Sequence, residues 1–272
     1  MKARNAGRRR FIMTILVLLV AVGVVTGGRA VVPFTIPVIP VARATPASSD
    51  AAGKLVEKAV AFLEEARDAS VTVTVVQFDP KSGREVGRMK SQVQVTAKPP
   101  VVRVLFLEPA ALEGQLVILD GEKDRAYLYS PVTEEVVVQS VAMAARQLGL
   151  PAMPGTGAGS GAGGFGVEGL LGIVPKEGAG KPGELAYTAR LVRYEKWRSA
   201  ESAAVVDVFS TAFPLGKQRL WILQESGQVV QVETYDEQDR LMVRVVLDSF
   251  QKNLGLRAEQ LLQLPKGARI VQ

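Results

Sequence analysis

Residues 91–131 restrict the fold most, because they read as a series of short strands separated by turn-forming residues. Apolar and polar residues alternate along this stretch, and the alternation is interrupted at Pro99-Pro100, Pro109, Asp120-Gly121 and Pro131. Alternation with a period of two, bounded by proline, glycine and aspartate, is typical of antiparallel β-structure. The sequence therefore predicts a mainly β fold.

The sequence on either side predicts more strands and some helices. Residues 51–69 carry apolar side chains at helical spacing with charges on the opposite side, which predicts an amphipathic helix. Short helices are expected over residues 140–148 and 258–262. Further strands are expected over residues 70–79, 85–97, 134–139, 184–194, 203–209, 218–225, 228–235, 240–250 and close to the C-terminus. The fold class is α+β but mainly β, with about ten or eleven strands.

The first 44 residues predict export. They contain seven basic residues and no acidic one, and an uncharged run over residues 11–28 follows the basic cluster. Gly28-Arg29-Ala30 and Ala42-Arg43-Ala44 both resemble cleavage sites, and residues 8–12 loosely match a twin-arginine signal. The uncharged run is also about as long as the 17–20 residues that cross a bilayer, so a cleaved signal peptide and an uncleaved anchor both stay open.

The rest of the chain reads as one domain. Residues 45–50 are small and polar, as expected of a linker, and residues 51–272 follow as the domain. Residues 151–172 form a glycine-rich insertion within it. Glycine-rich segments commonly behave as flexible coils, which predicts a linker. The alternative is a lid, with Phe165, Leu170 and Leu171 as its apolar contacts, since lids are often drawn from segments of low stability.

Composition excludes several functional classes. Without the first 44 residues the chain has 26 basic and 27 acidic residues, a net charge of −1, so no nucleic-acid surface is expected. The sequence contains no cysteine and no histidine. Disulfides, modification of an N-terminal cysteine, Ser-His-Asp or Cys-His catalysis, and zinc sites that use these residues are therefore excluded. We predict no catalytic residue, no metal and no cofactor, and a protein that is not an enzyme.

Two short motifs are set aside because their context is wrong. Gly159-x-Gly161-x-x-Gly164 formally matches a dinucleotide-binding fingerprint, but it follows a predicted helix rather than a strand. Asp120-x-Glu122-x-Asp124 begins like a calcium loop, but Arg125 occupies the position of the turn glycine.

Two strands are apolar on both faces. Residues 101–107 are interrupted only by Arg103, and residues 241–247 only by Arg244. One explanation is an ordinary core, because buried apolar residues are the norm. The other is a curved antiparallel sheet whose concave face leaves a cavity for an apolar ligand.

A set of short motifs resembles a known family. These are Lys98-Pro99-Pro100, Glu108-Pro109, Asp120-Gly121, Tyr127 with Tyr129-Ser130-Pro131, and, near the end, Tyr235-Asp236, Asp248-Ser249-Phe250, Asn253 and Leu264-Pro265-Lys266-Gly267. In this order, after an export signal and an amphipathic helix, they resemble the LolA-like periplasmic lipoprotein carriers. Relatives of these carriers are LolB and the lipid-sensing domain of RseB-type sigma-factor regulators. The resemblance covers residues 51 to the C-terminus.

The resemblance implies an incomplete antiparallel β-barrel whose opening is covered by helices and whose apolar interior takes up acyl chains. Two features depart from the family. The carriers commonly have an arginine before the proline that corresponds to Pro100, where it helps to hold the lid closed, and here Pro99 takes that position. The glycine-rich segment also replaces the helical lid.

The functional prediction is a non-enzymatic, extracytoplasmic or periplasmic carrier that binds acyl chains of lipoproteins or other lipids for transfer across the cell envelope. Membrane-bound donor and acceptor proteins are its candidate partners. The alternative is an RseB-like sensor of lipid or envelope stress that acts through a protein partner. The predicted apolar lining is Val104, Phe106, Tyr127, Tyr129, Phe209 and Trp221, and Met143, Phe165, Leu170 and Leu171 are predicted to contribute from the lid. Facing is inferred from alternation, so a shift of one residue inverts it.

Overall fold

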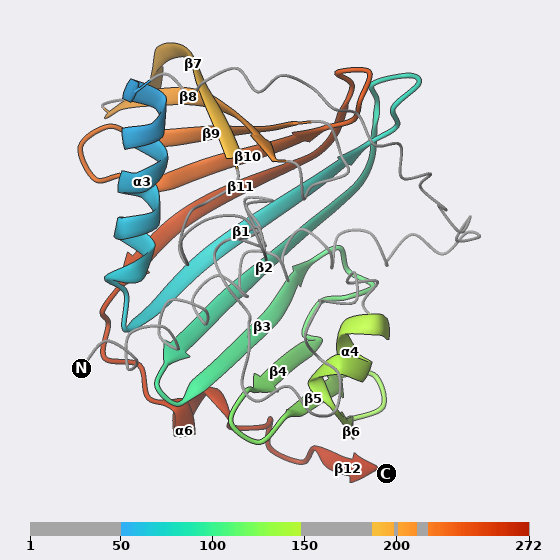
Figure 1. Cartoon of the computed structure of the whole chain (residues 1–272). Helices are drawn as coiled ribbons and strands as arrows, with labels where there is room; N and C mark the ends of the chain where they lie inside the picture. The colour runs from blue at the N-terminus through green and yellow to red at the C-terminus, as the bar shows by residue number, and fades with distance from the viewer. Residues whose placement is uncertain (1–49, 148–186, 199–200, 211–216, 272) are drawn as a thin grey trace, which may run out of the picture.

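The computed structural model describes residues 50–147, 187–198, 201–210 and 217–271, and it consists of one curved sheet with short helices against it (Figure 1). The described helices are α3 (Asp50–Glu64), α4 (Val141–Gln147) and α6 (Ala258–Leu261). The first strands are β1 (Asp68–Phe78), β2 (Glu85–Ala97), β3 (Pro100–Glu108), β4 (Leu116–Asp120), β5 (Arg125–Ser130) and β6 (Glu135–Gln139). The others are β7 (Tyr187–Trp197), β8 (Glu201–Ser210), β9 (Lys217–Leu223), β10 (Val229–Tyr235), β11 (Leu241–Lys252) and β12 (Arg269–Val271).

The twelve strands form a single sheet in the order β12-β6-β5-β4-β3-β2-β1-β11-β10-β9-β8-β7. β1 to β6 pair in sequence, and so do β7 to β11. The two series join where β1 pairs with β11, with Val73 opposite Leu247. β12 and β7 are the two edges, and the sheet does not close into a barrel.

The predicted mainly β, unclosed sheet is confirmed. The described residues form twelve strands, close to the predicted ten or eleven, but one pair is not antiparallel as predicted. The last pair, β12 with β6, is parallel, with Ile270 beside Val136. A parallel pair needs a crossover connection, and here the chain reaches β12 only after β11 and α6 on the other side of the sheet.

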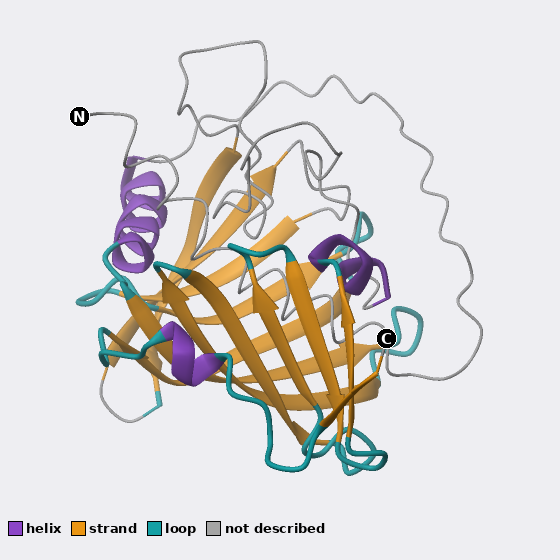
Figure 2. Cartoon of the chain, turned by 90° about the horizontal axis from the view of Figure 1, so that it is seen from below, coloured by secondary structure: helices purple, strands orange, loops and turns teal. Residues whose placement is uncertain are grey.

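The sheet has an inner and an outer face, which carry different helices. Along β3, Val102, Val104 and Phe106 belong to one buried cluster, which also contains residues of α3 and α4. Val101, next to Val102 in sequence, packs in a second cluster with Leu261 of α6. Successive side chains in a strand point to opposite faces, so α3 and α6 lie on opposite sides of the sheet. We name the face under α3 and α4 the inner face and the face under α6 the outer face (Figure 2).

Helix α3 packs on the inner face through one stripe. Ala52, Val56, Ala59 and Leu63 are buried at helical spacing. The helix ends at Glu64, before the predicted residue 69, because β1 already begins at Asp68. The buried carboxylate of Asp68 accepts hydrogen bonds from the backbone N–H groups of Leu254 (2.6 Å) and Gly255 (3.1 Å), which ties the start of β1 to the end of β11.

No helix of the described residues has both the length and the hydropathy that a membrane span requires. The longest of them, α3, has 15 residues and carries charges on its exposed side.

Candidate functional site

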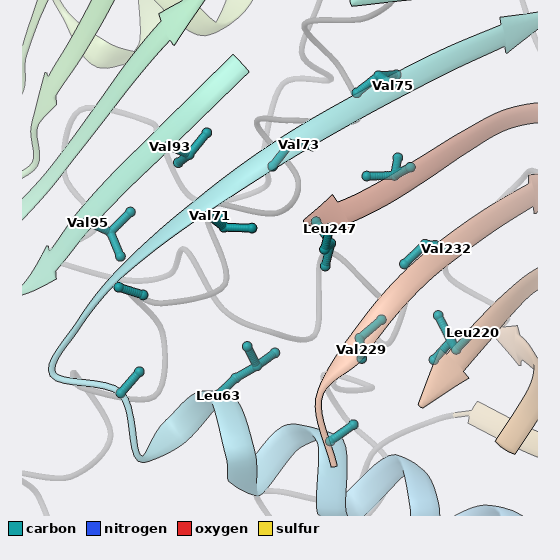
Figure 3. Close-up of a cluster of buried hydrophobic side chains, with 14 of the residues drawn as sticks. Leu63, Val71, Val73, Val75, Val93, Val95, Leu220, Val229, Val232 and Leu247 are labelled. Atoms are coloured by element: carbon teal, nitrogen blue, oxygen red, sulfur yellow. The ribbon is translucent and has the colours of Figure 1, made fainter. Parts of the chain in front are cut away.

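The inner face carries the largest cluster of buried apolar side chains in the described residues. Most of its buried side chains come from strands on both sides of the β1–β11 junction. Figure 3 labels Leu63 of α3 together with nine of the strand residues: Val71, Val73, Val75, Val93, Val95, Leu220, Val229, Val232 and Leu247. Strand pairing places Val93 beside Val71 and Val104, and Leu220 beside Val206 and Val232. The same apolar face therefore continues from β3 to β8.

Charged side chains avoid the middle of this face. In the described strands β1–β3 and β8–β11, the mid-strand charges all lie on the outer face, and they include Lys90, Arg103, Asp207, Arg219, Glu233 and Arg244. An apolar surface without charges can bind hydrocarbon, because no ionised group must lose its hydration when the ligand enters.

Helix α3 is fixed to one end of the inner face by polar contacts at its margins. Lys58 Nζ donates a hydrogen bond to the carbonyl oxygen of Gln224 at 2.6 Å. Lys252 Nζ donates to Glu65 at 2.8 Å and lies 4.1 Å from the ring centroid of Phe62. The rings of Phe62 and Phe250 are 5.4 Å apart between centroids. These contacts make α3 a fixed cover over this end of the face.

Helix α4 lies near the opposite edge of the sheet and leaves apolar side chains exposed. Ala144 is fully buried in the inner-face cluster. Met143 of the same helix is 56% exposed, and Val137 of β6, which pairs with Leu128, is 45% exposed. Met143 was predicted to contribute from the lid, and the structure places it at this edge. The predicted lid residues Phe165, Leu170 and Leu171 lie outside the described residues.

The six predicted lining residues do not share one face. Val104 and Phe106 lie on the inner face and are buried there. Tyr127 and Tyr129 lie on the outer face, where they pack in the cluster that contains Ala258 of α6. The prediction that these tyrosines line the same face as Val104 is corrected. Tyr129 pairs with Leu116 and Tyr127 with Ile118, and directly paired residues point to the same face of a sheet. Leu116 and Ile118 pack with α6, so the tyrosines point to the outer face as well.

Trp221 and Phe209 also lie on the outer face. Trp221 packs with Val205 in a third cluster, and its indole N–H donates to Glu195 Oε1 at 2.7 Å. Phe209 is two residues from the outer-face Asp207 in β8, and the guanidinium carbon of Arg190 lies 5.9 Å from its ring centroid. The prediction inferred facing from alternation, and the observed register places both residues on the opposite face from the one predicted.

The prediction missed inner-face residues that the alternation does mark. Leu128 lies between Tyr127 and Tyr129 and packs on the inner-face cluster. Ser91 lies on the inner face between the buried Met89 and Val93. The signal in the sequence was the position of the charged residues in each strand. Arg103 and Arg125 point to the outer face, so the strand residues next to each of them point to the inner face.

The outer face of β8 to β11 carries paired charges instead. Asp207 is fully buried and accepts hydrogen bonds from Arg219 Nε (2.7 Å) and Nη2 (3.2 Å). Burial works to raise the pKa of Asp207, but the hydrogen bonds and charge of Arg219, together with the charge of Lys217, outweigh it, so that the pKa is lowered.

A second pairing involves Glu233. Its Oε1 accepts a hydrogen bond from Arg244 Nε at 2.7 Å, and its Oε2 accepts one from the hydroxyl of Tyr235. Burial, followed by this hydrogen bond and the negative charge of Glu233, raises the pKa of Tyr235. Carboxylates whose acceptor sites are taken by arginines are poor general bases, so this network is structural. Within the described residues, no group of three or more acidic side chains is placed to hold a metal ion.

Two of the family-like motifs, Lys98-Pro99-Pro100 and Asp120-Gly121, lie where strands end or begin. Asp120 Oδ1 accepts the backbone N–H groups of Glu122 and Lys123, both at 3.1 Å, and the Gly121 N–H donates to the carbonyl oxygen of Pro100 at 2.8 Å. Pro99 itself is exposed at the β2–β3 turn. These hydrogen bonds hold the ends of β3 and β4 together.

The chain was compared with known proteins. The sequence matches no protein-family model and no curated protein. Solved structures with similarity to it include an uncharacterized conserved protein from Thermus thermophilus, with 14% identity, 81% of this chain and 98% of that chain covered, and a TM-score of 0.49. A putative outer membrane lipoprotein-sorting protein domain from Vibrio parahaemolyticus has 15% identity, coverage of 78% and 97%, and a TM-score of 0.39.

A LolA superfamily protein from Nitrosomonas europaea has 15% identity, coverage of 78% and 97%, and a TM-score of 0.33. A LolA superfamily protein and a lipoprotein-sorting domain are therefore among the solved structures to which this chain is similar.

Proposed function

We propose that the protein is a non-enzymatic carrier that binds acyl chains of lipoproteins or other lipids on the inner face of its sheet. One observation carries the proposal: this face is apolar from β3 to β8, and the mid-strand charges of the described strands β1–β3 and β8–β11 all lie on the opposite face. The first 44 residues direct the chain to the extracytoplasmic side, where envelope lipids need a carrier through water.

The physical basis is the transfer of hydrocarbon out of water. Each buried methylene contributes about 0.8 kcal/mol, so an acyl chain is held by contact area without a specific polar partner. An unclosed sheet suits this task, because a ligand enters from the side of the open face instead of through the end of a closed barrel.

The deciding experiment is native mass spectrometry of protein purified from its own envelope, with extraction and identification of what is bound. We expect a co-purifying lipid or acylated protein, and uptake of a fluorescent fatty-acyl probe by the emptied protein. A protein that is purified without bound lipid and takes up no probe would contradict the carrier proposal. The RseB-like sensor would then be tested through its protein partners.

A further inference from the structure

One polar side chain lies within the apolar inner face. Ser91 of β2 sits between Val73 of β1 and Phe106 of β3, its register partners on the two sides. Its exposed fraction is 0%, and its hydroxyl oxygen has no hydrogen-bond partner among the described residues. The inner-face neighbours along β2, Met89 and Val93, are buried and apolar. A valine at position 91 would continue this pattern without a polar atom.

Thr96, the other buried hydroxyl residue of β2, provides a comparison with Ser91. Thr96 is 3% exposed, and its hydroxyl donates to the carbonyl oxygen of Pro99 at 2.7 Å. A buried hydroxyl without such a partner costs free energy, and in folded proteins this exception needs an explanation. The difference between Thr96 and Ser91 points to a hydrogen-bond partner that arrives with the ligand.

We propose that the Ser91 hydroxyl donates a hydrogen bond to the carbonyl oxygen of an ester-linked acyl chain bound on the inner face. The inference rests on the proposed carrier function and names its ligand class. A bare hydrocarbon would leave the hydroxyl without a partner. One hydroxyl donor and one carbonyl acceptor satisfy each other, as in a neutral hydrogen bond between side chain and backbone.

The surroundings select a neutral carbonyl over an ionised head group. The mid-strand cations of β2 and β3, which are Arg88, Lys90 and Arg103, lie on the outer face. A carboxylate or phosphate beside Ser91 would lose its hydration without a counter-charge, which is far more costly than the burial of an ester. The charged part of the ligand therefore stays at the margin of the sheet.

The test compares two diacylglycerols of equal chain length, one with ester and one with ether linkages, as competitors of a fluorescent acyl probe. We expect the wild-type protein to bind the ester form about 3- to 10-fold more tightly, and Ser91→Ala to bind both forms with equal affinity. Thr74→Val removes a hydroxyl from the outer face of the neighbouring strand and keeps the wild-type preference.

Measurements of stability show whether a change in binding is caused by a change in folding. The free energy of unfolding of the lipid-free protein rises in Ser91→Ala, because an unsatisfied polar atom is removed, and falls in Thr96→Val, which removes a satisfied one. Equal binding of ester and ether by the wild type, or a preference that survives in Ser91→Ala, overturns the role of Ser91 while the carrier function stands. A wild-type protein that binds neither lipid overturns both.

Discussion

Asp207 of β8 and Arg219 of β9 form a two-point ion pair on the outer face, with Nε and Nη2 of the guanidinium 2.7 and 3.2 Å from the two carboxylate oxygens. The Asp207 side chain is 0% exposed and that of Arg219 is 20% exposed. Removing one partner of such a pair leaves the other charge buried without compensation. We expect Asp207→Asn to lower the free energy of unfolding by about 3 kcal/mol in urea titrations at pH 7.

The matched control is Glu85→Gln. Glu85 pairs with Arg88 at 2.9 Å, but both side chains are exposed to solvent, where ion pairs contribute little. An equal loss of stability in the two variants would contradict the assignment of Asp207 as a buried anchor.

The same ion pair predicts how stability depends on pH. Because the pKa of Asp207 is lowered in the folded state, its contribution is complete above its ordinary value of 3.8 and is lost as the pH falls below that value. The difference in unfolding free energy between wild type and Asp207→Asn should therefore shrink between about pH 5 and pH 2. A difference that stays constant across this range would mean that Asp207 does not titrate with unfolding.

Leu128 and Tyr127 are neighbours in β5 on opposite faces, and both are half-buried. We expect Leu128→Lys to lose at least about 10-fold in affinity for a fluorescent acyl probe, because it puts a charge on the inner face. Tyr127→Lys should keep the probe affinity although it disturbs the contact with α6. Probe titration of both variants, after a check of their far-UV spectra, decides the matter. Loss of probe binding in Tyr127→Lys but not in Leu128→Lys would indicate that the ligand binds on the outer face.

Gly227, in the turn between β9 and β10, lies directly under α3. Its φ is +79°, and a Cβ atom there would come within 2.9 Å of the carbonyl oxygen of Lys58. Gly83, in the β1–β2 turn, has a φ of +66° and open space around it. Gly83→Ala should cost about 1 kcal/mol from backbone strain, and Gly227→Ala about 1–3 kcal/mol more from the clash. Equal losses in urea unfolding would show that α3 moves away without cost.

Arg103 holds the segment that crosses the outer face. Its Nη1 donates to the carbonyl oxygens of Leu261 (3.0 Å) and Gln263 (2.6 Å), and burial lowers its pKa. Arg103→Met should speed amide hydrogen exchange across residues 257–271 and lower stability by about 1–3 kcal/mol. Arg103→Lys should fall in between, because an ammonium still donates hydrogen bonds to carbonyl oxygens but is held less rigidly than the planar guanidinium. Unchanged exchange in this segment would mean that the apolar cluster alone holds it.

Local pattern was enough to predict the strands and helices, because each is bounded by its own turn residues. The facing of the strands was harder. Tyr127 and Tyr129 were predicted to line the ligand site. They lie two and four residues after Arg125 in the same strand, and so point to the outer face with it. Arg103 and Arg244 mark the outer face of their strands in the same way. The facing of a residue is predicted better by counting its distance from a charged residue in the middle of the strand: an even number of residues means the same face, and an odd number the opposite face.

Long-range packing escaped prediction for a physical reason. Residues 101–107 are apolar on both faces because one face meets α3 and α4 across the core while the other meets α6. Nothing local in β3 distinguishes these two partners, since α6 lies far along the chain. The parallel β12–β6 pair depends on the same return of the chain and was missed with it.

The pairing of β1 with β11 has a consequence for how this chain folds as it is synthesised. Val73 finds Leu247 only after most of the sequence is available, so the native topology has many contacts between distant residues and should form slowly. Until then β1 is an open strand edge beside an apolar surface, which favours pairing with other chains. A chain that is synthesised N-terminus first therefore exposes this edge of β1 until β11, the last long strand, is available to cover it.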